Sequence, residues 1–168
     1  MLFDLMRRWA PVPIRLIVGY GFFAHGLAKI EKGPEHFVAM VQAIGVPLAT
    51  PMAWLTILVE LVCGVLMIVG ALVPLITIPM LTVVTVALFT VHIQYGFTSI
   101  KLMAVTTAGP QFGPPGIETD LLYIACMATL VLGGPGPWAA DNWLSRKLEL
   151  RSRTYSEVRR SQRMRKIG

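Results

Sequence analysis

Four apolar segments of this sequence are each about as long as a lipid bilayer is thick, and they restrict the folds open to the chain. They cover residues 14–30, 52–72, 75–95 and 118–134. A helix needs about 20 apolar residues to cross the hydrocarbon core of a bilayer, with a range of about 17–25. The segments do not alternate strictly between apolar and polar residues, which argues against the strands of a membrane barrel. We therefore expect an all-α, polytopic membrane protein built as a four-transmembrane-helix bundle.

The composition of the 168 residues agrees with a membrane location. Hydrophobic residues make up 55% of the chain and charged residues 14%, whereas soluble domains average roughly 45–50% and about 25%. A chain of this length forms about one domain, so a second core cannot hide the excess of apolar residues. Cys63 and Cys126 lie inside apolar segments without a CxxC motif. We expect neither a disulfide framework nor a thiol relay.

The net charge of +6 is concentrated at one end of the chain. Residues 144–168 hold nine Lys or Arg and two Glu, a net charge of +7, while residues 1–143 have a net charge of −1. Membrane proteins retain basic residues on the cytoplasmic side, and this bias explains the tail without nucleic acid. We expect anionic lipid or a cytoplasmic protein to bind the tail.

The basic residues also predict how the chain is oriented in the membrane. Arg7, Arg8 and Arg15 flank the first span, and the nine-base tail follows the fourth. An even number of spans places both termini on one side, so we expect cytoplasmic N- and C-termini in a bacterial inner (plasma) membrane. Residues 1–143 would form the membrane domain, and residues 144–168 a basic cytoplasmic tail.

The two longer loops lie on the outer side in this orientation. Apolar residues recur with the spacing of one helix face in residues 37–44, between Gly-Pro signals, which predicts a short amphipathic helix in the first outer loop. Residues 108–116 are rich in Gly and Pro and are not expected to be helical. The second and third spans are joined only through Val73 and Pro74, which predicts a tight antiparallel hairpin.

Few ionisable residues lie within the spans, and such residues mark functional sites more often than they do in soluble proteins. The candidate site residues all fall in the outer half of the predicted bundle: His25, Lys29, Glu60, His92, Asp120 and Tyr123. Glu60 lies in mid-span, so its carboxyl group must be protonated or paired. We expect His25, Glu60 and His92 to be the reactive residues. Lys29, Asp120 and Tyr123 would help to bind a cofactor.

Each of these residues also has a structural interpretation. Lys29 can extend its amine to the outer interface, His92 can be an interfacial histidine, and Asp120 can cap the fourth helix. Glu60 bonded to His25 or Lys29 would join the first two spans. These interpretations stay open beside the functional ones.

Two histidines and a carboxylate from three helices allow three kinds of chemistry. They can relay protons to and from a quinone, form an open metal site or ligate haem. We favour the quinone over metal or haem. The histidines are not at a close helical spacing, and the sequence has no CxxCH motif for covalent haem attachment.

Five short motifs occur in a specific order along the chain. The first span contains RLIVGYGFFAHGLAKI, the short helix ends in IGVP, and LVELVCGVLMIVGALVPL covers the second span and its turn. GIETDLLYIA and GGPGPWAADNWL border the fourth span. Over roughly residues 14–145 the sequence resembles the DoxX family. The resemblance implies a four-helix integral membrane protein, and the wider DoxD/DoxX grouping includes subunits of thiosulfate:quinone oxidoreductase.

The polar residues and the resemblance together predict a quinone-linked redox subunit of the inner membrane that acts with other subunits of a membrane complex. The alternative is a non-catalytic anchor or assembly subunit of a larger respiratory or oxidase complex, in which case the chain is not an enzyme. The small number of spans and the lack of broken-helix repeats disfavour a small-molecule transporter.

Overall fold

The computed structural model describes residues 1–143, 145 and 146, and confirms that the chain is mostly helical. The elements follow in the order α1 (Leu2–Trp9), α2 (Pro11–Glu31), α3 (Pro34–Ala43), α4 (Ala49–Val69), α5 (Val73–Ala87), η1 (Leu88–His92), η2 (Ile93–Tyr95), β1 (Leu102–Thr106), β2 (Gly109–Phe112) and α6 (Glu118–Gly133). The basic tail predicted for residues 144–168 lies outside the described residues, except for Ser145 and Arg146.

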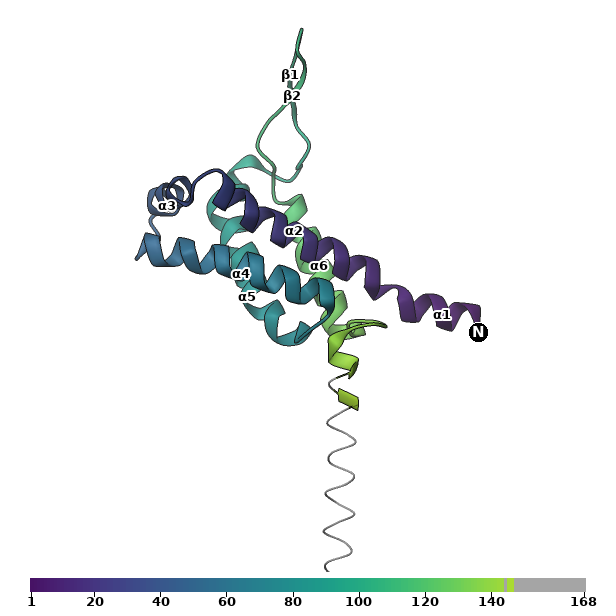
Figure 1. Ribbon diagram of the computed structural model, residues 1–168. Helices are drawn as coiled ribbons and strands as arrows, with labels where there is room; N and C mark the ends of the chain where they lie inside the picture. The colour runs from purple at the N-terminus through teal and green to yellow at the C-terminus, as the bar shows by residue number, and fades with distance from the viewer. Residues whose placement is uncertain (144, 147–168) are drawn as a thin grey trace, which may run out of the picture.

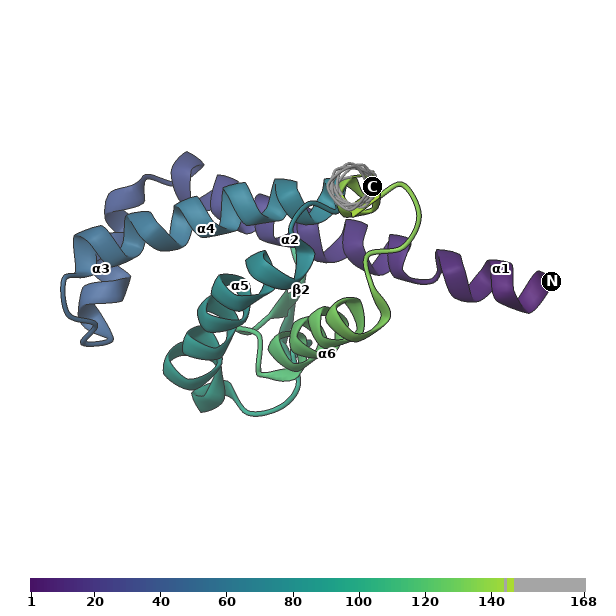
Figure 2. The ribbon, with the colours of Figure 1, turned by 90° about the horizontal axis from the view of Figure 1, so that it is seen from below.

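Four long helices, α2, α4, α5 and α6, pack around one apolar core. α2 contacts α4 and α6, and α5 contacts the same two helices, so α2 with α4 and α5 with α6 form two pairs (Figure 2). Their most deeply buried side chains include Val18, Met67, Met80, Met127 and Leu130. We call the end of the bundle that carries α3 and the β-hairpin the loop end. The opposite end, with the turn between α4 and α5, is the terminal end (Figure 1).

The four predicted spans correspond to α2, to α4, to α5 continued through η2, and to α6, with shifts of a few residues at their ends. Among the described residues, α4 and the stretch Val73–Tyr95 are long and apolar enough to cross a membrane, with mean hydropathies of 2.4 and 2.1. α2 has 21 residues but includes the polar residues Arg15, His25 and Lys29, and α6 has only 16 residues. Neither helix is therefore both long enough and apolar enough by the same measure.

α2 and α4 come into backbone contact because glycines lie where the two helices cross. A Cβ atom at Gly19 would lie 2.7 Å from the carbonyl oxygen of Gly64, and one at Gly64 would lie 2.7 Å from the amide nitrogen of Phe23. Further toward the loop end, a Cβ atom at Gly26 would lie 3.0 Å from the Cβ atom of Glu60. Helix association in lipid depends on close packing of small residues of this kind.

A buried arginine joins α2 to the segment after α6 at the terminal end. Arg15, predicted to flank the first span on its N-terminal side, lies near the start of α2 and is only 4% exposed. A buried guanidinium must find hydrogen-bond acceptors, and its Nη1 atom donates to the carbonyl oxygen of Pro135 at 2.9 Å. The chain after α6 is therefore folded back onto the start of α2.

Asp141 fixes the turn between α4 and α5. Its carboxylate accepts hydrogen bonds from the backbone N–H groups of Leu72 at 2.6 Å and Val73 at 3.0 Å, two donors at the start of α5 that the helix cannot satisfy itself. The turn is thus formed by residues 70–72. Val73 and Pro74, predicted as the turn, instead begin α5.

β1 and β2 form an antiparallel hairpin that projects from the loop end (Figure 1). Residues 108–116 are not helical, as predicted, but part of them pairs with β1, so the all-α expectation is wrong for this loop. Every residue of β1 is exposed. The base of the hairpin is held by Ser99, whose hydroxyl donates to the carbonyl oxygen of Gly116 at 3.1 Å.

Two short helices flank the bundle. α3 corresponds to the amphipathic helix predicted from residues 37–44 and packs on α4, with Val41 buried. α1, which the sequence did not lead us to expect, continues beyond the other helices at the N-terminus (Figure 2). Its last residue, Trp9, packs edge-on against Trp138, with ring centroids 4.9 Å apart.

The contact between α2 and α4 predicts that Gly64→Ala destabilises the protein. The added methyl group would meet backbone atoms of both Gly19 and Phe23, and overpacking of this kind costs about 1–3 kcal/mol. Gly133→Ala is the matched control, since a Cβ atom there has no neighbour within 4 Å. Thermal unfolding in detergent micelles should show a lower Tm for Gly64→Ala alone; equal Tm values for the two variants would contradict the contact.

Candidate functional site

Two pairs, each of one basic and one acidic side chain, lie toward the loop end of the bundle. In the first, the Nζ atom of Lys29 on α2 donates to both carboxylate oxygens of Glu60 on α4. The Glu60 residue is only 5% exposed. A charged carboxylate at such a depth requires a partner, and Lys29 supplies it from the neighbouring helix.

The second pair joins η1 to α6. The Nδ1 atom of His92 lies 2.6 Å from Oδ2 of Asp120, and Asp120 is also 5% exposed. His92 ends a π-helical turn that interrupts the regular winding after α5. An extra residue in a turn rotates the side chains that follow it, and π-helical turns occur frequently at functional sites.

His25 belongs to neither pair. It is one helical turn before Lys29 on α2, its side chain is exposed, and it makes no hydrogen bond or ion pair with any described residue. His25 is therefore an accessible basic side chain on the same helix as Lys29.

Tyr123 approaches α2 from α6, on the helix face that also carries Asp120. Its ring contacts the edge of Phe22 with centroids 5.5 Å apart and an interplanar angle of 86°. Its hydroxyl oxygen reaches α2 at Gly21, where a Cβ atom would lie only 1.8 Å from it. Only a residue without a side chain leaves room for the hydroxyl at this position.

Two structural interpretations from the sequence do not hold in this arrangement. The Lys29 amine does not extend to the interface, because it is bonded to Glu60 and lies 4.6 Å from the centroid of the Phe37 ring on α3. Asp120 does not cap α6, which has no side-chain cap at its N-terminus, but binds His92. The interpretation in which Glu60 joins the first two helices through Lys29 does match the geometry.

Sequence reasoning missed Phe37 and Gly21 as neighbours of the polar residues. Phe37 was assigned to the apolar face of a surface helix, yet its ring covers the ammonium group of Lys29, a favourable cation–π geometry. Nothing in the sequence distinguishes Gly21 from the other glycines of the first span. The sequence alone contains no signal that Tyr123 would point at it.

The arrangement can exchange protons but offers little for a metal ion. Each carboxylate is already bonded to one basic group, so His25 is the accessible group with a nitrogen that can donate or accept a proton. Among the described residues, no three His, Cys, Asp or Glu side chains are grouped closely enough to hold a metal.

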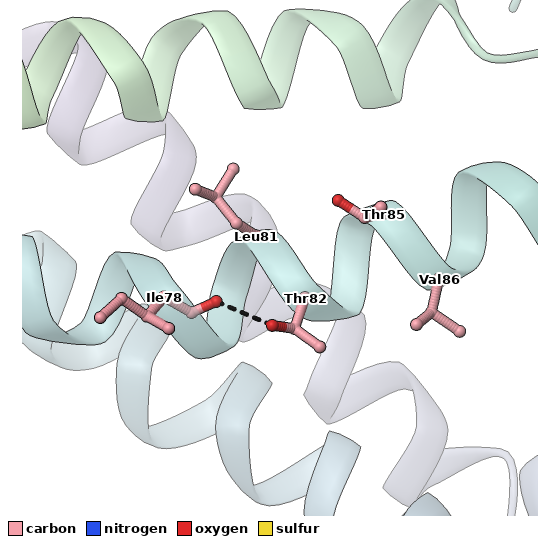
Figure 3. Close-up of a pocket in the computed structure, with 5 residues that line it drawn as sticks. All are labelled: Ile78, Leu81, Thr82, Thr85 and Val86. Carbon is pink, nitrogen blue, oxygen red and sulfur yellow. Dashed lines mark hydrogen bonds between the residues drawn. The ribbon is translucent and has the colours of Figure 1, made fainter.

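A pocket that contains none of these residues lies on α5 (Figure 3). It is lined by Ile78, Leu81, Thr82, Thr85 and Val86. The Thr82 hydroxyl donates to the carbonyl oxygen of Ile78 at 3.1 Å, as a threonine does on an apolar helix surface. The pocket is mostly apolar, and we assign no chemistry to it.

Comparison with known proteins agrees with the fold. The family model described as DoxX matches residues 10–93, which include His25, Lys29, Glu60 and His92 and end before α6. An uncharacterized membrane protein of Mycobacterium tuberculosis, Rv3486, is 32% identical over 145 residues, covering 80% of this chain and 80% of its own length. No solved structure matches the chain. The chain belongs to the DoxX family of membrane proteins.

Proposed function

We propose that this protein is a quinone-linked redox subunit of a bacterial inner-membrane complex, with its site in the outer half of a four-helix transmembrane bundle. The observation that carries the proposal is the accessible His25, one turn from Lys29 on α2, together with two acid–base pairs whose carboxylates are buried. Buried charged groups are costly in a membrane and are retained mainly at ion, proton or ligand sites. A purely apolar bundle would need none of them.

The orientation is part of the proposal. Arg7 and Arg8 lie on α1 at the terminal end, and the sequence continues after α6 into the basic tail. The positive-inside bias then places the terminal end in the cytoplasm. His25, three-quarters of the way along α2, would lie nearer the outer leaflet.

The donor set fits a quinone headgroup. When bound, a quinone takes up two electrons and two protons to become a quinol, with the electrons supplied by a partner redox protein. A ring nitrogen of His25 would donate a hydrogen bond to one carbonyl oxygen and transfer one of the two protons there, and water at the outer surface would supply the proton for the other oxygen. The Lys29–Glu60 and His92–Asp120 pairs would set the local charge and return a proton to His25. Phe37 would shield the first pair from water.

A second candidate function is that of a non-catalytic anchor or assembly subunit, and the β-hairpin favours it. Apolar side chains on the hairpin are exposed, including Leu102, Met103, Val105 and Phe112. A two-stranded hairpin has little stability of its own in water, and a partner subunit docked on it would cover these side chains. In this case the ion pairs serve only to join helices.

Topology can be tested by labelling single cysteines in a background of Cys63→Ala and Cys126→Ala. We expect Thr107→Cys, at the tip of the hairpin, to react with a membrane-impermeant maleimide on intact cells. Asn142→Cys, at the terminal end, should react only after permeabilisation, because the basic end resists translocation. Both positions are exposed, so accessibility depends on the side of the membrane. The reverse pattern would contradict the orientation.

The redox proposal predicts that the His25→Leu variant loses the quinone that co-purifies with the protein. The Glu60→Gln variant should keep the bound quinone, but its quinone-dependent turnover should fall by about 10²-fold. Gln is nearly isosteric with Glu and can still accept a hydrogen bond from Lys29, but it cannot transfer a proton. Glu35→Gln on α3 is the matched control, because Glu35 is exposed. Quinone extracted per mole of protein and turnover in the intact membrane are the measurements.

The same variants separate the two candidate functions. If His25→Leu and Glu60→Gln fold, insert and keep full quinone content and turnover, the ion pairs are structural. In the anchor interpretation, replacing Val105 and Phe112 with Ser should instead release a co-purifying subunit while leaving the bundle intact.

A further inference from the structure

We propose that α1 is an interfacial anchor, whose apolar face enters the lipid leaflet at the terminal end of the bundle while its arginines bind anionic headgroups. This inference rests on the membrane location of the chain and is independent of the redox proposal. It starts from the distribution of residue types around α1 and from the position of this helix beyond the bundle (Figure 2).

Apolar and charged residues lie on opposite faces of α1. Each residue turns a helix by about 100°, so positions i, i+3, i+4 and i+7 share one face. In α1 these positions are all apolar: Leu2, Leu5, Met6 and Trp9. The charged residues of the helix fall on the other side: Asp4, Arg7 and Arg8. This separation is typical of helices that lie along a membrane surface.

The apolar face of α1 is open in the structure. In the part of the chain that the structure describes, no residue of α1 is buried. Leu2, Leu5 and Met6, together with the neighbouring Phe3, are 53–86% exposed. Exposure of so many large apolar side chains to water is unfavourable, so this face requires an apolar environment outside the described residues.

The apolar face of α1 continues onto the outer surface of the bundle. Ala10 has helical backbone angles, with φ −52° and ψ −38°, so the winding is preserved between α1 and α2. Leu16 and Tyr20 follow Trp9 at intervals of seven and four residues, and both are exposed. Exposed apolar side chains on the outside of a membrane-protein bundle face lipid. The face of α1 therefore borders a lipid-facing surface.

The side chains around this face suit the headgroup region. Trp9 packs edge-on against Trp138, which is exposed, and tryptophans are enriched where a membrane meets water. Arg7 and Arg8 are exposed, and long arginine side chains can reach lipid phosphates beside an embedded helix. They outnumber the single acidic residue, Asp4. A second copy of α1 would carry the same excess of positive charge, whereas anionic lipid carries the opposite charge.

The test uses electron paramagnetic resonance of the full-length protein in vesicles of phosphatidylcholine and phosphatidylglycerol. A spin label is attached to Met6→Cys, on the apolar face, or to Asp4→Cys, on the polar face, in the Cys63→Ala/Cys126→Ala background. We expect the label at position 6 to collide more often with oxygen, which concentrates in lipid, than with a water-soluble nickel chelate. The label at position 4 is the matched control and should show the reverse preference.

The Arg7→Gln/Arg8→Gln variant tests the headgroup contact, with the label at position 6. Each arginine removed should lower the ratio of lipid-bound to water-exposed label by about 5-fold in these vesicles. Lys32→Gln is the control, because Lys32 is exposed at the loop end, and it should leave the ratio unchanged. The basic tail is present in every variant, so its own attraction to lipid cancels. Vesicles of phosphatidylcholine alone should remove the difference between the variants.

Three results would overturn the proposal. If the nickel chelate reaches both labels equally, α1 extends into water. If oxygen and the chelate are both excluded from position 6, protein covers the face, either a second copy of the chain or a partner subunit. If the arginine substitutions leave the ratio unchanged in anionic vesicles, headgroups do not hold α1. None of these measurements involves quinone, so each result leaves the redox proposal as it stands.

Discussion

The close approach of α2 and α4 is the contact on which the rest of the structure depends. Gly19 and Gly64 bring the two backbones together, and Gly26 packs directly against the Cβ atom of Glu60. The Glu60 side chain must then extend along α2 toward Lys29, three residues beyond Gly26, which is close enough to bond both of its oxygens. A wider separation of the helices would leave a carboxylate buried without its cation, at a cost of several kcal/mol.

α2 acts as the common partner in this bundle, because α4 and α6 both pack on it. Its face toward α4 carries Gly19 and Gly26, and its contact with α6 is made at Gly21 and Phe22. His25 emerges where these contacts end, toward the loop end. At the other end of α2, Arg15 holds the segment after α6 through Pro135. One helix therefore fixes both the position of His25 and the closure of the chain.

The sequence predicted the helices well because their signal is local. Apolar runs, Gly-Pro boundaries and the spacing of apolar residues in α3 depend only on neighbours in the chain. It also placed His25, Glu60 and His92 at one end of the bundle, since rise per residue converts position into depth. Glu60 was expected to need a partner, and Lys29 was one of the two named.

Pairing across helices was harder to predict, because it depends on how each helix is rotated. Asp120 stood at the start of α6, where an acidic residue is a natural cap, and only the rotation of α6 turns it toward His92. The π-helical turn adds a rotation of its own that no residue in η1 announces. The burial of Arg15 was not predicted for a similar reason: its acceptor, Pro135, is 120 residues away. The hairpin was missed because the Gly and Pro residues of 108–116 indicate a loop rather than a strand.

The charge of the Lys29–Glu60 pair bears on which ligands the proposed site could bind. Because Lys29 is matched to Glu60, this pair has no net charge to attract an anion or a metal ion. A charged ligand would have to break the pair and leave its partner buried and uncompensated, which is costly in a low-dielectric interior. An uncharged molecule that bonds through its oxygens to His25 would leave the pair intact. In the proposed site, the pair that joins α2 to α4 would therefore favour a neutral, membrane-soluble ligand.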